Sequence, residues 1–419
     1  MRIGLITGEY PPAQGGVGDF TRELGRALVE LGHEVHVITG RSQIANGKSQ
    51  VADYESRITP VSTRDHESRI TDYELRITPV STRDHESREV AVHRVVEGWR
   101  WGCWKQVIAL ASELGLEMLD VQYQAAAYGM HPAINFVPRR RGHPLVVVTF
   151  HDLKVPYLFP KAGPLRWQVV RMLARRADGS VVTNREDYLR LAGEVPPARL
   201  SLIPIGSNIP LAPPAGYDRD AERARWGVGP GDLLLGYFGF LNESKGGEEL
   251  VQALALLVEG GVPAHLLMVG GQFGSSDPTN RAYAGRVEGL IAGLSVEERV
   301  HWTGYTRPED VSAGLLATDV CVLPYRDGIS FRRGTLHACL AHERALVTTR
   351  PAVALPEVRD GENMLLVEPR DPEGLAGAVM RLAADPALRA RLEAGAAALT
   401  AEFTWERIAR QTAAFARRL

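Results

Sequence analysis

Short apolar segments alternate with helix-like segments along both halves of this chain. In the first half the apolar segments lie at 3–7, 35–39, 90–96, 118–123, 144–150, 177–183 and 202–205. In the second half they lie at 233–238, 265–269, 300–303, 320–323, 346–348 and 365–367. Strands that alternate with helices form parallel sheets covered by helices on both faces. The pattern therefore predicts an α/β protein of two doubly wound, Rossmann-like domains.

The length of the chain supports two domains. A chain of 419 residues exceeds what one hydrophobic core usually organises. The segment that follows the first set of strands is rich in Gly and Pro, which is typical of a linker. We therefore predict an N-terminal domain over 1–205, a linker over 206–230 and a C-terminal domain from 231 onward, with a cleft between the domains as the binding site.

The composition excludes several classes of protein. Charged residues make up 23% of the chain and the formal net charge is −2, so nothing in the overall charge attracts nucleic acid. The three cysteines lack metal-ligand spacing and cannot form a disulfide framework, which favours a reducing interior. No signal-peptide pattern opens the chain and no apolar run reaches the length of a membrane span. We expect a cytoplasmic protein.

A basic region suggests one exception to a purely soluble location. Residues 139–176 contain nine Lys or Arg and a single acid, Asp152. Basic and apolar residues mixed on one helix can lie on an anionic membrane surface, here the inner face. A solvated helix face is the alternative.

A tandem duplication interrupts the first domain. Residues 53–69 recur with one substitution as 72–88, within an insert over 41–90. Two short polar copies cannot bury a face of their own, so we expect an inserted loop without a role in the chemistry. His66 and His85 are read as copied surface histidines rather than metal ligands.

The first strand leads into a loop rich in Gly and Pro over 8–20. Its glycines do not match the dinucleotide fingerprint and no acid follows the second strand, so a nicotinamide cofactor is disfavoured. Glycines here would let the backbone approach a ligand closely. A plain tight turn is the alternative.

A second loop, over 324–335, joins a predicted strand to a predicted helix. It carries Arg326, Arg332 and Arg333 together with the small residues Ser330, Gly334 and Thr335. A helix N-terminus has unpaired N–H groups and partial positive charge, so this loop and Lys245 in the loop 239–247 favour a phosphate or diphosphate. A solvated basic loop is the alternative.

His151 follows the central strand 144–150, at the sheet edge where ligands collect in parallel α/β domains. A structural histidine is the alternative. No acidic or histidine cluster with metal spacing lies near these loops, so cationic side chains would have to stabilise the charge of a departing diphosphate.

Several motifs in order resemble one enzyme family. They are GEYPP at 8–12, GGVG at 15–18, TFHD at 149–152, GFL at 239–241, SKG at 244–246, LPE at 355–357 and DGEN at 360–363. Together they look like the retaining family-four glycosyltransferases of group 1, which have the GT-B fold. The resemblance covers the chain apart from the insert.

The resemblance implies a nucleotide-sugar donor held by the C-terminal domain over 231–403 and a carbohydrate or lipid-linked acceptor held by the N-terminal domain. It also implies a helix over 404–419 that packs back on the N-terminal domain, and transfer with retention. Its implied site residues are Lys245 on the diphosphate, Gly16 near the donor, His151 on the transferred sugar, Asp327 on the sugar hydroxyls and Tyr305 near the nucleobase. The lack of a metal-spaced motif near the loops predicts that the transfer needs no metal.

The chain departs from the family in two places. The family usually has an Arg after Gly239, where this chain has Phe240, and Thr335 stands where the second acid of a Glu-x7-Glu motif is expected. We hypothesise that Arg332 or Arg333 supplies the missing cation.

The sequence thus predicts a hexosyltransferase-type enzyme for polysaccharide, glycolipid or glycoconjugate synthesis that needs no cofactor. The alternatives are a silent nucleotide-sugar-binding relative and a GT-B sugar-nucleotide epimerase.

Overall fold

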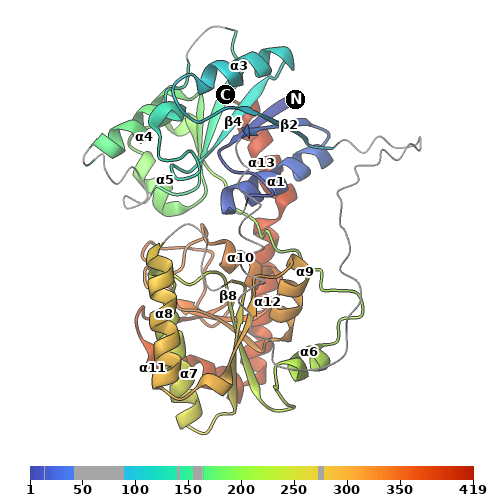
Figure 1. Cartoon of the computed structure of the whole chain (residues 1–419), viewed down its shortest axis with the longest axis vertical. Coiled ribbons are helices and arrows are strands. Elements are labelled where there is room, and N and C mark those ends of the chain that lie inside the picture. The colour runs from blue at the N-terminus through green and yellow to red at the C-terminus, as the bar shows by residue number, and fades with distance from the viewer. Residues whose placement is uncertain (14, 42–88, 139–141, 154–162, 164, 272–277) are drawn as a thin grey trace.

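Two α/β domains lie one above the other in the computed structural model (Figure 1). The structure describes residues 1–13, 15–41, 89–138, 142–153, 163, 165–271 and 278–419. The tandem repeat, most of the insert and part of the basic region therefore lie outside the described residues. The alternation of strands and helices in the sequence gives the predicted doubly wound architecture.

The N-terminal domain is built on a seven-stranded sheet in the order β3-β2-β1-β4-β5-β6-β7, and neighbouring strands pair in parallel. Strand order reverses beside β1, so the ligand-binding crevice of such a fold is expected at the carboxyl ends of β1 and β4. The strands are β1 Arg2–Thr7, β2 Glu34–Gly40, β3 Ala91–Val96, β4 Met118–Tyr123, β5 Leu145–Phe150, β6 Gly179–Val182 and β7 Leu200–Leu202.

The helices of this domain cover both faces of its sheet. They are α1 Gly16–Glu30, α3 Cys103–Glu113, α4 Leu165–Arg176 and α5 Arg185–Leu191, with short 3₁₀ turns at Pro132–Asn135 and Pro197–Arg199. Helix α1 begins at Gly16, inside the segment 8–20 that the sequence suggested was a loop, so the glycines open the helix.

The C-terminal domain has a six-stranded sheet in the order β10-β9-β8-β11-β12-β13, again paired in parallel. Its strands are β8 Leu233–Phe238, β9 Ala264–Val269, β10 Val300–Gly304, β11 Val320–Leu323, β12 Ala345–Thr349 and β13 Leu365–Val367. Its helices are α7 Gly247–Glu259, α8 Pro278–Gly293, α9 Pro308–Ala317, α10 Gly334–Ala341, α11 Pro372–Ala384 and α12 Pro386–Thr400. Short 3₁₀ turns lie at Glu243–Lys245, Glu297–Arg299 and Ala401–Phe403.

The segment 206–230 between the sheets contains a helix that the Gly and Pro content did not indicate. This helix, α6 Arg219–Arg225, is anchored to the C-terminal domain because both Arg219 and Arg223 pair with Asp319, at 2.6 and 2.9 Å. The second half of the segment is therefore part of the C-terminal domain.

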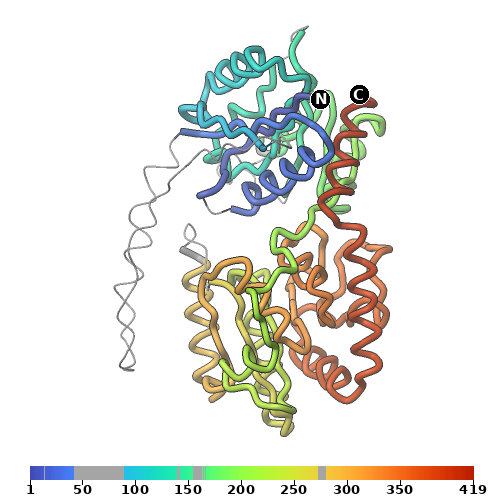
Figure 2. The backbone as a smooth tube through the Cα atoms, turned by 90° about the vertical axis from the view of Figure 1, so that its right-hand side faces the viewer, coloured from blue at the N-terminus to red at the C-terminus, as the bar shows by residue number. Residues whose placement is uncertain are grey.

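The last helix, α13 Trp405–Arg417, leaves the C-terminal domain and packs against α1 of the N-terminal domain (Figure 2). Its buried side chains, including Ile408 and Phe415, share one apolar cluster with Leu5, Phe20 and Leu24. None of the helices in the described ranges combines the length and apolar character that a membrane span requires.

Candidate active site

Two loops of the C-terminal domain meet at the carboxyl ends of β8 and β11. The loop after β8 carries Lys245, and the loop after β11 carries Arg333 at the N-cap of α10. Strands β8 and β11 are neighbours in the sheet, so these loops lie side by side at the edge where parallel α/β domains bind ligands.

Arg326 fastens the two loops together. Its backbone N–H donates to the carbonyl of Ser244 at 2.9 Å, and its Nε lies 2.8 Å from Glu249 Oε1 on α7. Its guanidinium also contacts the carboxylate of Glu248. The position of Lys245 is therefore set by a network of contacts between the loops.

Lys245 is partly buried, with its Nζ close to the backbone of Gly239. Burial and, to a smaller extent, the positive charge of Arg333 lower the pKa of Lys245 to about 7. A depressed lysine pKa beside a second cation indicates a place where an anion would be bound favourably.

Arg333 contacts residues of both loops. Its Nη1 donates to Ser244 Oγ at 3.3 Å, and its guanidinium lies over the ring of Tyr325, 4.5 Å from the centroid. The Tyr325 hydroxyl is 2.7 Å from Thr335 Oγ1 in the first turn of α10. Lys245, Arg333 and Thr335 are thus brought together, as the anion-site prediction requires.

Asp327 and Arg332 take part in ion pairs beside this site. The carboxylate of Asp327 forms an ion pair with both Arg333 and Arg332, the latter at 2.9 Å. Arg332 also reaches across to the N-terminal domain, where its Nη1 lies 3.3 Å from Glu186 Oε2. Of the two arginines, Arg333 neighbours Lys245 and Arg332 bridges the domains.

The start of α10 also approaches the N-terminal domain. A Cβ atom at Gly334 would lie 3.9 Å from Asn208 Oδ1, and Asn208 Nδ2 donates to Asp19 Oδ2 on α1 at 3.3 Å. Ser330 contributes its carbonyl to the turn, where it accepts from the Arg333 N–H at 3.1 Å. Within the described residues, the Ser330 side chain forms no hydrogen bond.

Gly16 opens α1 on the opposing domain. A Cβ atom there would meet no protein atom within 4 Å, so packing inside the protein does not demand glycine at this position. The next two amides, of Val17 and Gly18, donate to the carboxylate of Glu9 at 3.0 and 3.4 Å. Burial raises the pKa of Glu9, against the effect of these hydrogen bonds. This part of the helix terminus is therefore already occupied by an acid of the chain.

His151 lies at the end of β5, beside the end of β4. Its Nε2 is 3.0 Å from Gln122 Oε1, and its ring meets the ring of Phe20 edge-on with centroids 4.6 Å apart. Burial lowers the pKa of His151 to about 3, so the imidazole is neutral at physiological pH. Since an amide oxygen only accepts, Nε2 carries the proton and Nδ1 can accept a hydrogen bond.

Tyr305 follows β10 and is 67% exposed. Phe240 lies close by, because a Cβ at Gly271 would be 3.0 Å from the Phe240 ring and 3.9 Å from Tyr305 Cβ. Two aromatic side chains therefore flank Gly271, and one of them, Phe240, directly follows Gly239 in the chain.

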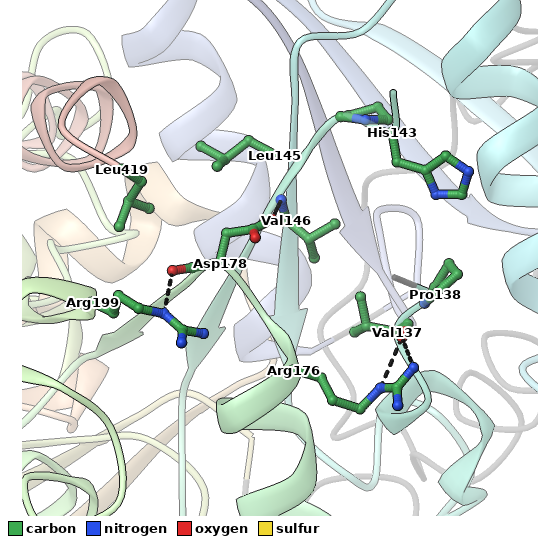
Figure 3. A pocket seen from close by; sticks show the side chains of 10 residues that line it. Val137, Pro138, His143, Leu145, Val146, Arg176, Asp178, Arg199 and Leu419 are labelled. Carbon is green, nitrogen blue, oxygen red and sulfur yellow. Dashed lines mark hydrogen bonds between the residues drawn. The ribbon is translucent and has the colours of Figure 1, made fainter. Parts of the chain in front are cut away.

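A cavity of about 870 Å³ lies at the amino ends of the N-terminal strands, where β5 begins (Figure 3). Three of the charged side chains that line it are engaged within the protein. Arg176 donates to the carbonyl of Val137, Arg199 donates to the carbonyls of Arg175 and Asp178, and the Asp178 carboxylate accepts from the Val146 N–H. It is distant in the fold from Lys245 and His151.

In the part of the chain that the structure describes, no group of three or more His, Cys, Asp or Glu could hold a metal ion.

Sequence reasoning missed three residues that shape this site. Glu186 is 146 positions from Arg332 in the chain, and no local pattern indicated their contact. Glu9 stood out in the sequence only as part of the motif at 8–12, which gave no sign that its carboxylate accepts from the start of α1. Gln122 stands near the end of a predicted strand, and its place at the carboxyl edge was the available signal.

Two family models match the chain. The model described as "Glycosyl transferase 4-like domain" matches residues 15–206, and the model described as "Glycosyl transferases group 1" matches residues 232–385. The matched ranges correspond to the two sheets of the fold.

The curated relatives include D-inositol 3-phosphate glycosyltransferases. The Corynebacterium efficiens protein is 30% identical over 254 residues, 58% of this chain and 56% of its own length. The Corynebacterium urealyticum protein is 29% identical over 218 residues, 51% of this chain and 50% of its own length. The chain spans about half the length of the curated relatives it matches.

Solved structures share the fold over the whole chain. Sucrose-phosphate synthase from Thermosynechococcus elongatus has a TM-score of 0.69 at 23% identity and covers 100% of this chain and 98% of its own. Anabaena Alr3699/HepE in complex with UDP and glucose has a TM-score of 0.71 at 17% identity and covers both chains fully. The motifs, the two family models and the GT-B architecture agree, and the chain belongs to the group 1, family-four glycosyltransferases.

Proposed function

We propose that this glycosyltransferase moves a hexose from a nucleotide-diphosphate donor to a hydroxyl acceptor, with retention of configuration and without a metal ion. The observation that carries the proposal is the proximity of Lys245 and Arg333 at the carboxyl edge of β8 and β11. Two cations and the first turn of α10 can stabilise the negative charge that develops on the departing diphosphate.

The proposed chemistry needs no protein base. The acceptor oxygen bonds to the anomeric carbon on the face from which the diphosphate leaves, while the bond from that carbon to the phosphate oxygen breaks. The acceptor proton passes to a leaving phosphate oxygen. His151, whose pKa is lowered to about 3 by burial, orients the sugar through hydrogen bonds instead of acting as a base.

The comparisons suggest the class of donor and one class of acceptor. The Anabaena structures are described as complexes with UDP, UDP-glucose, or UDP and glucose, and the curated relatives are named for D-inositol 3-phosphate. We therefore propose a uridine-diphosphate hexose as the first donor to test. A phosphorylated polyol stands beside carbohydrate and lipid-linked hydroxyls as a first acceptor to test. The product would enter polysaccharide, glycolipid or glycoconjugate synthesis.

The first experiment is a thermal-shift screen of nucleotide diphosphates and their sugars. A ligand at about 100 times its dissociation constant adds roughly 2.7 kcal/mol of stability. We expect Lys245→Ala to abolish the shift and Lys105→Ala, on the exposed side of α3, to keep it. Equal shifts in the two variants would contradict the proposed diphosphate site.

The second experiment follows the reaction itself. With an α-linked donor, NMR of the product should show an α-linkage, and activity should persist after treatment with a chelator. A β-linked product would reject retention, and loss of activity that added metal restores would reject metal independence. Donor binding without transfer or hydrolysis would favour a silent relative, and conversion of the donor sugar to its epimer would favour an epimerase.

Contact with anionic membrane lipids through residues 139–176 stays a prediction. Leu165 at the start of α4 is 65% exposed, which suits such a contact, but Arg171 and Arg175 both pair with Glu194. Sedimentation with anionic vesicles at low salt tests it. Protein left in the supernatant would end the idea.

A further inference from the structure

A series of ion pairs crosses from one domain to the other beside the proposed diphosphate site. From the N-terminal side it runs through Arg190, Glu186, Arg332, Asp327 and Arg333. The end at Arg333 adjoins the loop that carries Lys245, because Arg333 Nη1 donates to Ser244 Oγ at 3.3 Å. This series of ion pairs therefore links helix α5 to the cationic loops.

The end of this series of ion pairs that lies in the N-terminal domain is held firmly. Glu186 lies in the first turn of α5, where Asn184 caps the helix by accepting from the Asp187 N–H at 2.9 Å. Arg190 lies 2.7 Å from Glu186 Oε1 and also donates to the carbonyl of Leu153 at 2.7 Å, two residues after His151. The carboxylate of Glu186 is thus fixed relative to the strand end that carries His151.

In the C-terminal domain, this series of ion pairs depends on the carboxylate of Asp327, which is shared by two arginines. Asp327 pairs with two guanidiniums, and the side chain of Arg332 is only 8% exposed. A guanidinium with so little water around it needs partners within the protein. While Glu186 is in place, Arg332 has a second acid, and Asp327 can hold Arg333 as well.

We propose that Glu186 is a positioning residue of the transferase, which through Arg332 and Asp327 holds Arg333 beside Lys245 when the domains are closed. The inference rests on the proposed function, in which Arg333 contacts the diphosphate. When the domains separate, Arg332 loses Glu186 and relies on Asp327, so Arg333 is less firmly held. Closure and completion of the cationic site are therefore one event.

Glu186→Gln tests this proposal, because the amide keeps the size of the side chain and removes its charge. Glu186→Asp keeps the charge. Glu194→Gln is the matched control, since Glu194 also pairs with two arginines but entirely within the N-terminal domain. For each variant the thermal midpoint and the steady-state constants for donor and acceptor are measured, together with those of Lys245→Ala.

We expect Glu186→Gln to lower kcat/KM for the donor about tenfold with the acceptor KM and the thermal midpoint unchanged. A tenfold loss corresponds to about 1.4 kcal/mol. Glu186→Asp should recover most of the loss, and Glu194→Gln should behave as the unmodified enzyme. Raised salt should reduce the difference between Glu186→Gln and the unmodified enzyme, because it screens a partly exposed ion pair.

Each outcome decides between the proposals. If Lys245→Ala impairs donor use but Glu186→Gln does not, the positioning role is wrong and the proposed function stands. If Glu186→Gln lowers the thermal midpoint and affects donor and acceptor alike, Glu186 is merely structural and the inference fails. If neither variant affects donor use, the proposed diphosphate site fails and the inference fails with it.

Discussion

The Nζ atom of Lys245 lies 2.8 Å from the position that a Cβ atom would occupy at Gly239. The same position is 2.5 Å from Thr335 Cγ2, and the φ angle of Gly239 is +116°. The turn after β8 thus leaves room for a lysine and for the start of α10 because its own residue has no side chain. Glycine here is required by both the backbone conformation and the close approach.

Replacement of Gly239 by Ala should therefore disable the site. The added methyl would push Lys245 and Thr335 apart and strain the turn, and we expect nucleotide-diphosphate affinity to fall at least about tenfold, roughly 1.4 kcal/mol. Calorimetric titration measures it. Gly261→Ala is the control, because Gly261 also has a positive φ, of +77°, with nothing near its Cβ position. Equal affinities in both variants would show that the crowding at Gly239 is unimportant.

Donor binding should take up a proton above neutral pH. The pKa of Lys245 is about 7 without ligand, lowered by burial and then by Arg333, so the amine is largely neutral at pH 8. A bound diphosphate favours the ammonium form, hence affinity should fall as the pH rises above about 7. Calorimetry at pH 8 in buffers of different ionisation enthalpy detects the uptake with an intact nucleotide sugar. Uptake that persists in Lys245→Met would assign the proton elsewhere.

Asp120→Asn should stabilise the protein at alkaline pH. Burial raises the pKa of Asp120 from 3.8 to about 7, while Thr149 donates to its Oδ1 at 2.8 Å. The folded state keeps a proton that the unfolded chain releases between these pH values, so wild-type stability falls as the pH rises from about 4 to 7. Asparagine cannot ionise. Urea unfolding should show that the variant gains more free energy of unfolding over the wild type at pH 8 than at pH 5. Equal gains at the two pH values would refute the raised pKa of Asp120.

Tyr305→Ala should weaken nucleotide binding without loss of stability. The side chain is 67% exposed, so its removal opens no cavity, whereas stacking of a base on an aromatic ring contributes about 1–3 kcal/mol. Tyr305→Phe keeps the ring and should bind like the unmodified protein. The two affinities, measured with the thermal midpoints, decide whether Tyr305 receives the nucleobase. Unaltered binding in Tyr305→Ala would exclude it.

Much of the fold followed from short-range patterns. Apolar runs such as 233–238 and 320–323 predicted the strands, and the edge at their carboxyl ends brought Lys245 and Arg333 together as the loop positions indicated. These are consequences of parallel-sheet geometry, which relates every strand end to one edge.

The partners of the site residues could not be predicted in the same way. The motif that assigned Asp327 to sugar hydroxyls gave no sign that its carboxylate pairs with two arginines, one of which is held by Glu186 from the other domain. Such contacts depend on how two separate sheets face each other. No periodicity within either half of the sequence contains that information, and α6 was missed because its anchor, Asp319, is likewise distant in the chain.

The return of α13 to the N-terminal domain has a consequence for biosynthesis. The first domain to leave the ribosome lacks Ile408 and Phe415, which complete one of its apolar clusters, until the whole of the second domain has been translated. A nascent chain that pauses after residue 206 would carry an exposed groove along α1, and a fragment cut there should need the α13 peptide in trans to become soluble.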